Sequence, residues 1–237
     1  MERINVHFRD LGLIDYKEAW DYQENIFDEI LGVKTKNMKQ VVEEKHPPEN
    51  HLLFCEHPHV FTMGKSGNQS NLLINEAVLK QKGASFYKIN RGGDITYHGP
   101  GQIVGYPIFD LEQFDLGVKE YIFKLEESII LVLKEFDIEA SRLQGATGVW
   151  LDADDARKAR KICAIGVRAS RYVTMHGFAF NVNTNLDYYQ LINPCGFTDK
   201  GVTSMKKELN AIQRFAEVQE VLKNKLSRVF GFRIIEK

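Results

Sequence analysis

Cysteine, proline and long apolar runs are all scarce in this chain of 237 residues. It has six prolines and three cysteines, Cys55, Cys163 and Cys195. The cysteines are odd in number, far apart and never in a CxxC pair, so we expect neither a disulfide framework nor a structural zinc site. No stretch approaches the roughly 18 consecutive apolar residues that suggest a membrane span. The charged beginning MERINVHFRDLG lacks the apolar run of a signal peptide, which predicts a cytoplasmic protein without a membrane anchor.

An excess of charge of either sign is also absent. Lysine and arginine total 31 against 32 acidic residues, a formal net charge of −1. Nucleic-acid binders usually carry a strong positive field, so we expect no nucleic-acid partner. The chain shows no internal repeat, low-complexity tract or linker-like segment, and these absences predict one domain over residues 1–237.

Helical and strand patterns alternate along the chain. Asp15 is the expected cap of a first helix with Tyr16, Ala19, Trp20, Gln23, Phe27 and Ile30 on its apolar side. Further helices are expected at 75–82 and 118–136, and a last one runs through Ile212, Phe215, Val218, Leu222 and Leu226 to a stop at Gly231. Strands are expected at 52–61, 85–90, 102–111, 149–151, 161–169, 172–182 and 232–235. The polar stretch 34–50 is expected to be a solvated excursion. The pattern predicts an α+β fold, with antiparallel strands flanked by helices.

The stretch 91–105, RGGDITYHGPGQIVG, has the highest density of unusual residues. Its glycines allow a ligand to lie directly against the backbone, while Arg91, Thr96, Tyr97 and His98 supply donors and flat surfaces around it. Two ordinary turns flanking a strand are the alternative interpretation. The spacing GxGxxxG is one residue too long for a dinucleotide fingerprint. Gly64, Lys65 and Ser66 resemble the end of a phosphate loop, but the first glycine that this loop requires falls on His59, so neither nucleotide motif is present.

Histidines are present without the partners that a metal site requires. His57, His59, His98 and His176 occur without HExxH or CxxC spacing, so we expect no metal. His98 and His176 are interpreted as wall or hydrogen-bonding residues of a site. A Cys/His dyad stays open, because a nucleophile and its base meet only in the fold.

Two segments contain candidates for nucleophilic catalysis. INPCG sets Cys195 between proline and glycine in a constrained turn, where a thiol can be reached by a carbonyl and ionised by a nearby cation. KICAIG begins with Lys161 at the head of an apolar strand, where burial would favour a neutral amine that acts as a base. A core thiol and a strand-end lysine that extends its charge to solvent are the alternatives.

Taken together, these segments resemble the octanoyltransferases of lipoate synthesis, also called lipoyl(octanoyl) transferases, over nearly the whole chain. The family pattern is carried by EHPHVFTMG, RGGDITYHGPGQIVGYP, GVW, KICAIGVR, HGFAFNVN, INPCG and VTS, in this order. The order and spacing of the whole set are specific, whereas any single glycine pair is weak. The resemblance implies a fold like the biotin and lipoate protein ligase catalytic domain, with a mixed, largely antiparallel sheet, and it implies one catalytic domain over residues 1–237.

By that resemblance, Cys195 matches the acyl-carrying nucleophile and Lys161 matches its partner. The positions that match the substrate-binding residues are Arg91, Gly92, Gly93, Asp94, Ile95, Thr96, Tyr97, His98, Ala164, Ile165, Gly166, Gly177, Phe178 and Ala179. The implied donor is octanoyl-acyl carrier protein. The implied acceptors are the lipoyl domains of 2-oxoacid dehydrogenase E2 subunits and the glycine cleavage H protein. No cofactor is expected, since forming an amide from a thioester is downhill and needs no ATP.

Two other functions are compatible with the same sequence. An ATP-dependent lipoate protein ligase has the same fold but needs no nucleophilic cysteine. A catalytically silent module that holds lipoyl domains or acyl chains would need neither Cys195 nor Lys161.

Overall fold

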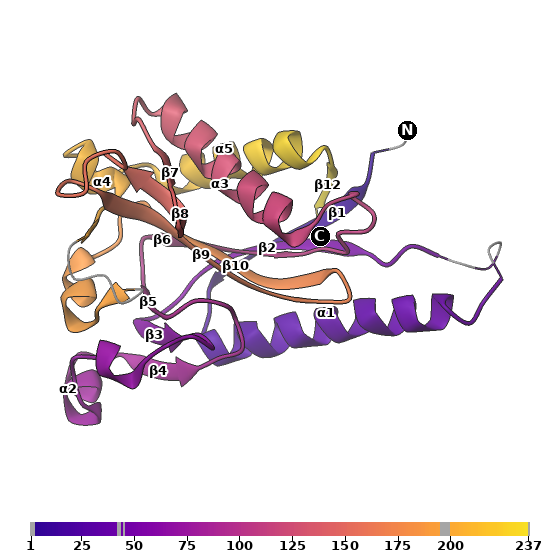
Figure 1. Ribbon diagram of the computed structural model, residues 1–237, viewed down its shortest axis with the longest axis horizontal. Coiled ribbons are helices and arrows are strands. Elements are labelled where there is room, and N and C mark those ends of the chain that lie inside the picture. Colours follow the sequence, from indigo (N-terminus) through magenta and orange to yellow (C-terminus); the bar gives the residue numbers. More distant parts are fainter. Residues whose placement is uncertain (1–2, 42–43, 45, 195–199, 237) are drawn as a thin grey trace.

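The computed structural model describes residues 3–41, 44, 46–194 and 200–236, which form two β-sheets with helices packed on them (Figure 1). In spatial order the larger sheet contains β12 (Arg233–Glu236), β1 (Asn5–Leu13), β2 (Asn50–Glu56), β6 (Gln102–Ile108), β10 (Val173–Asn181), β9 (Arg160–Ser170), β8 (Ala146–Leu151) and β7 (Ser141–Leu143), with β11 (Gly201–Val202) paired to β9. The smaller sheet contains β4 (Ser85–Lys88), β3 (Val60–Met63) and β5 (Ile95–His98).

The larger sheet is mixed. Strand β10 runs antiparallel to both β6 and β9, and β2 with β6 and β8 with β9 are antiparallel as well. Strand β1 is parallel to both of its neighbours, β2 and β12. The predicted α+β class with a largely antiparallel sheet is confirmed.

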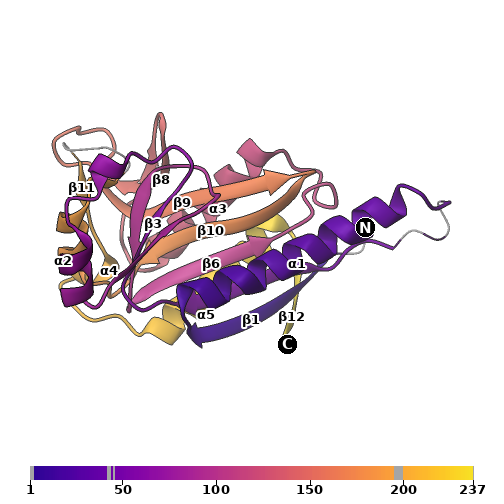
Figure 2. The same cartoon turned by 90° about the horizontal axis from the view of Figure 1, so that it is seen from below.

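Helices cover both faces of this sheet. Helices α3 (Val118–Glu135) and α5 (Phe215–Phe230) pack on one face, and α1 (Tyr16–Asn37) crosses the other (Figures 1 and 2). The shorter helices are α2 (Glu76–Gln81), α4 (Met205–Glu208) and the 3-10 helices η2 (Gln69–Asn71) and η3 (Leu186–Leu191). Within the described ranges, none of the helices is long and apolar enough to cross a bilayer.

The two helices on the first face follow their sequence patterns. The α3 stripe of Tyr121, Leu125 and Ile129 is fully buried against the sheet. Burying side chains of this size contributes about 1.5–3 kcal/mol each to the hydrophobic term. Helix α5 ends at Gly231, whose left-handed φ of 79° suits glycine. Ile212 precedes α5 and is exposed, so its predicted place on the helix is wrong.

Helix α1 begins as predicted and ends later than expected. The Asp15 side chain accepts a hydrogen bond from the Lys17 backbone N–H at 2.8 Å, which satisfies one of the free donors of the first turn. The helix continues to Asn37, and Lys34 in its last turn forms ion pairs with Asp110 and Glu112 on the loop after β6. The expected solvated excursion at 34–50 is therefore wrong at both ends, since residues 34–37 are helical and Asn50 is buried at the start of β2.

The expected single strand over 52–61 is also wrong. Strand β2 ends at Glu56 in the larger sheet, and β3 begins at Val60 in the smaller one. Pro58 has no backbone N–H to offer to a ladder, and the His57 ring turns to bond the Ile14 carbonyl oxygen at 2.8 Å. The chain therefore changes sheets here, and the two sheets come to face a common space.

Candidate active site

A cavity of about 470 Å³ lies between the two sheets, a volume typical of small-molecule sites. The wall residues that the sequence predicted are Arg91, Gly92, Gly93, Asp94, Ile95, Thr96, His98, Ala164, Ile165, Gly166, His176, Gly177, Phe178 and Ala179, with Lys161 beside them. The wall residues that sequence reasoning missed are Tyr16, Ser66, Val104, Tyr106, Ile122, Gly145, Ala146, Thr147 and Val167. Segments far apart in the sequence thus share one cavity.

Tyr97 is the one described residue of the predicted set that lies away from this wall. Side chains alternate across a strand, so Tyr97 projects from β5 on the face opposite to Thr96 and His98. It stacks on Tyr188 with ring centroids 4.9 Å apart, and its hydroxyl lies 2.7 Å from the His59 ring. Its expected contact with substrate stays a prediction.

Close backbone contacts fix the glycine-rich turn against the larger sheet. The Gly92 N–H donates to the Val167 carbonyl oxygen of β9 at 2.9 Å. A Cβ at Gly166 would lie only 3.0 Å from the Gly92 oxygen, and one at Gly177 would lie 2.1 Å from the Gly105 oxygen. Side chains at these two positions would push the turn or β6 away, so glycine is required for the cavity to have this shape.

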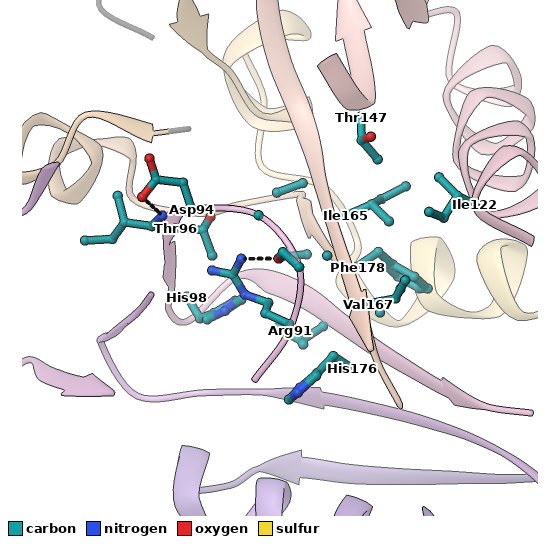
Figure 3. Close-up of a pocket in the computed structure, with 18 of the residues that line it drawn as sticks. Arg91, Asp94, Thr96, His98, Ile122, Thr147, Ile165, Val167, His176 and Phe178 are labelled. Carbon is teal, nitrogen blue, oxygen red and sulfur yellow. Dashed lines mark hydrogen bonds between the residues drawn. The ribbon is translucent and has the colours of Figure 1, made fainter. Parts of the chain in front are cut away.

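Arg91 brings a buried positive charge to the cavity wall. Its guanidinium donates to the Thr62 carbonyl oxygen at 2.7 Å and to the Gly92 carbonyl oxygen at 3.0 Å, which joins the turn to β3. Figure 3 shows Arg91 between His98 and His176, with Ile122, Ile165, Val167 and Phe178 gathered on another side. The cavity therefore has a polar side and an apolar side.

The two histidines of the polar side are held neutral. Burial, together with neighbouring positive charge from His57 and Arg91, keeps the pKa of His98 well below its ordinary value. Burial and the charge of Arg91 lower the pKa of His176 to about 3. His98 Nδ1 lies 2.9 Å from Gln102 Oε1, and His176 Nε2 lies 2.7 Å from Asn90 Oδ1. Across the described part of the chain, no group of three or more His, Cys, Asp or Glu side chains is arranged to hold a metal ion.

Lys161 lies buried where the cavity meets a second, smaller one. Its Nζ donates to the Thr147 carbonyl oxygen at 3.0 Å and lies 4.6 Å from the centre of the Trp150 ring. The smaller cavity, of about 20 Å³, is lined by Lys161 together with Pro194 and Val202. Val202 of β11 pairs with Lys161 of β9, so the chain segments on either side of 195–199 meet at this lysine.

The three cysteines divide into two sealed thiols and one that lies outside the described residues. Cys55 and Cys163 are fully buried. Burial raises the pKa of Cys55 well above its ordinary value and raises that of Cys163 despite the opposing charge of Lys161. Thiols held protonated inside a core are poor nucleophiles. The predicted nucleophile, Cys195, falls within 195–199, outside the described part of the chain.

Comparison with known sequences gives a consistent set of relatives. Residues 15–227 match the family described as "Lipoyl protein ligase A/B catalytic domain". An octanoyltransferase of Parabacteroides distasonis is 55% identical over 230 residues, which are 97% of this chain and 98% of the relative. An octanoyltransferase of Christiangramia forsetii is 56% identical over 226 residues, 95% of each chain.

Solved structures with low sequence identity share the fold. A putative lipoate protein ligase from T. acidophilum superposes with a TM-score of 0.69 at 13% identity, over 99% of this chain and 88% of that one. A lipoate-protein ligase A bound with ATP gives 0.66 at 13% identity, over 100% of this chain and 90% of that one. The expected similarity to the lipoate ligase catalytic domain is confirmed at the level of fold.

Proposed function

The chain belongs to the lipoyl protein ligase A/B catalytic-domain family, among its octanoyltransferases, and from that premise we propose its reaction in detail. It is an acyltransferase. It takes an octanoyl group from octanoyl-acyl carrier protein, carries it as a thioester on Cys195, and passes it to a lysine amine of lipoyl domains. The acceptors are the lipoyl domains of 2-oxoacid dehydrogenase E2 subunits and the glycine cleavage H protein. This transfer is the first step of endogenous protein lipoylation.

One observation carries the proposal: a buried lysine lies in the cavity wall beside the residue that precedes a cysteine. Lys161 and Pro194 line the same small cavity, and Cys195 follows Pro194 directly in the sequence. An ammonium group next to a thiol favours the thiolate, which is the nucleophilic form. Since Cys55 and Cys163 are sealed in the core, Cys195 is the cysteine assigned to carry the acyl group.

The proposed steps balance in protons and bonds. The Cys195 thiolate attacks the donor thioester, and the bond between the acyl carbon and the carrier's sulfur breaks. The departing thiolate takes a proton from the Lys161 ammonium, which leaves a neutral amine. The acceptor amine then attacks the acyl-enzyme and gives its proton to Lys161 as the carbon–sulfur bond to Cys195 breaks. Thiolate and ammonium are thereby restored.

The cavity supports an alkyl chain as the bound group. Ile122, Ile165 and Phe178 offer it apolar surface, and the neutral rings of His98 and His176 close the polar side without a charge of their own. The predicted substrate-binding residues of 91–98, 164–166 and 177–179 are proposed to hold the acyl group, with Tyr97 acting through its stacking on Tyr188.

Intact-mass measurement tests the nucleophile. Wild type incubated with octanoyl-acyl carrier protein should gain one octanoyl group, and Cys195→Ala should gain none. Cys163→Ala is the matched control, since it removes a thiol from the adjacent strand β9 but should still become acylated. Octanoyl transfer by Cys195→Ala at the wild-type rate would show that the nucleophile is assigned wrongly.

An ATP-dependent lipoate ligase is the second candidate, because the fold relative of 13% identity was solved bound with ATP. The two reactions differ in their requirement for nucleotide. We expect transfer from octanoyl-acyl carrier protein to a lipoyl domain without ATP, and no adenylate from free octanoate with ATP. ATP-dependent use of free acid with no transfer from the carrier protein would favour the ligase.

A further inference from the structure

Glu126 is a buried carboxylate on α3, on the side of the helix that faces the hairpin of β7 and β8. Its side chain is about a tenth exposed. Oε1 accepts a hydrogen bond from the Gly148 backbone N–H at 2.9 Å, and Oε2 accepts one from Arg142 Nε at 3.0 Å. Burying a carboxylate is costly unless it is paired and hydrogen-bonded, and these two contacts offset that cost for Glu126.

The bond from Gly148 connects Glu126 to Lys161 through a single peptide group. The Gly148 N–H and the Thr147 C=O belong to the same planar unit and point in opposite directions in a trans peptide. Glu126 accepts from the N–H, while the C=O accepts from Lys161 Nζ at 3.0 Å. Hydrogen bonds arranged in such a chain polarise one another, so the carboxylate makes the Thr147 oxygen a better acceptor for the amine.

The pairing of β8 with β9 is irregular beside the 147–148 peptide, and the Glu126 side chain bonds that peptide. The pairing of β8 with β9 shifts register between Val149 and Trp150, next to the position of Lys161. Irregularities of this kind re-aim nearby side chains and are frequent beside active sites. Gly148 has a φ of 120°, and a Cβ there would lie 2.5 Å from the Cys163 oxygen and 3.3 Å from Lys161 Cε. The backbone at 148 thus lies against the lysine side chain.

We propose that Glu126 is a positioning residue for the acyl transfer. It sets the orientation of the 147–148 peptide, and that peptide holds the Lys161 amine in the cavity wall. This inference rests on the proposed role of Lys161. Arg142 keeps the carboxylate in place, because it also donates to Glu127 Oε2 at 2.8 Å and to the Phe123 carbonyl oxygen at 3.0 Å.

Shortening the side chain by one methylene tests the idea with its charge retained. Glu126→Asp should withdraw the carboxylate from Gly148 and lower kcat for transfer from preformed octanoyl-enzyme to a lipoyl domain by about 10- to 100-fold, as misplaced groups near a reaction do. KM for the lipoyl domain should stay within about twofold, since the peptide does not shape the acceptor surface. Single-turnover kinetics over a range of acceptor concentrations separate the two constants.

Glu127→Asp is the matched control. It makes the same chemical change one residue along α3 and disturbs the same arginine, but Glu127 makes no contact with Gly148 among the described hydrogen bonds. We expect its kcat to stay within about twofold of wild type, since partly exposed ion pairs contribute little. Equal losses in both Asp variants, or wild-type kcat in Glu126→Asp, would overturn the inference.

A rescue separates positioning from charge or general stability. In Glu126→Gln combined with Arg142→Met, the amide oxygen can still accept from Gly148 without a competing donor. Its kcat should exceed that of Glu126→Asp by about tenfold if the hydrogen bond positions Lys161; a kcat no higher than that of Glu126→Asp counts against it.

Lys161→Ala distinguishes a failure of the proposed function from a failure of the inference about Glu126. Full activity there removes the proposed function's base, whereas an inactive Lys161→Ala with a fully active Glu126→Asp removes only the role of Glu126.

Discussion

His176 holds an unusual backbone conformation in the middle of β10, on the cavity wall. Its φ of 60° lies in the left-handed region, which non-glycine residues seldom adopt. The backbone N–H of His176 donates to Gln23 Oε1 of α1 at 3.0 Å, and the ring bonds Asn90. Strained residues of this kind persist where their surroundings hold them, and they cluster at ligand sites. Packing of α1 on the sheet therefore helps to shape the proposed acyl site.

The buried neutral state of His176 predicts acid sensitivity. Burial lowers the pKa of this histidine from 6.5 to about 3, so between these values the unfolded chain binds a proton that the folded protein does not. Its contribution to stability is thus full above about pH 6.5 and is lost as the pH falls toward 3. In His176→Asn, the slope of unfolding free energy against pH between about pH 6 and 4 should decrease by up to about 1.4 kcal/mol per pH unit. Urea unfolding at several pH values measures it.

His46→Asn is the control, because it removes an imidazole from an exposed position. Asparagine tolerates a left-handed φ, so His176→Asn should keep the strand geometry at pH 7. A pH slope in His176→Asn equal to that of wild type would contradict the assignment of a neutral buried ring.

Wall residues could be predicted from the sequence where a motif marks them. The glycine-rich run pointed to Arg91 and His98, and both line the cavity. Tyr16 and Ile122 were missed because each looks like an ordinary residue of its own helix, and Thr147 because it lies outside the strand expected at 149–151. Only the packing of α1, α3 and the β8 hairpin around the sheet brings them to the same space.

At the scale of elements, hydrophobic periodicity was sufficient for the long helices and insufficient for strand boundaries. The three- and four-residue spacing in α3 identified its buried stripe, because one sheet covers one face of that helix. The apolar residues before and after Pro58 were joined into one expected strand, although the polar segment 56–59 and the proline itself interrupt the run where the chain changes sheets. β1 was missed because its exposed charges conceal Val6 and Phe8, which face the core.

Asp15 is the N-cap residue of α1, and this single side chain stabilises the start of the helix. Asp15→Ala leaves the first turn of α1 without its side-chain acceptor and should lower the free energy of unfolding by about 1 kcal/mol. Asp15→Ser keeps an oxygen at this position and should recover most of the loss. Urea unfolding of both variants at neutral pH measures the difference. An equal loss in both would mean that Asp15 acts through its charge and not as a cap.

At the scale of the whole molecule, the cavity exists because the two sheets are tied together. Tyr16 of α1 stacks on Tyr87 of β4, in the smaller sheet, with ring centroids 5.5 Å apart, while Phe27 of the same helix packs against the larger sheet. Arg91 and Gly92 link β3 to β9 through backbone oxygens. One domain over residues 1–237 stays a prediction, and we propose that these contacts make the smaller sheet a dependent part of it.

A core substitution in the smaller sheet tests that unity when it is observed from the larger one. The chain has two tryptophans, so in Trp20→Phe the fluorescence reports Trp150 on β8 alone. Phe61 is fully buried in the smaller sheet, and Phe61→Ala in this background should cost about 3–5 kcal/mol. If the sheets unfold together, the urea midpoint from Trp150 fluorescence should fall to a value that corresponds to this whole loss of free energy. It should also coincide with the midpoint from circular dichroism.

The exposed Leu73 provides the control for this experiment, since Leu73→Ala removes apolar surface near the same sheet and should change stability by less than about 0.5 kcal/mol. A Trp150 transition that Phe61→Ala leaves in place would mean that the smaller sheet unfolds by itself. The cavity would then open without loss of the larger sheet, and bound acyl chain should stabilise only the smaller unit. If the protein is a single cooperative domain, the urea midpoints from Trp150 fluorescence and from circular dichroism should coincide, both for the free enzyme and for the octanoyl-enzyme. The acyl group would then be held between two sheets that cannot separate independently.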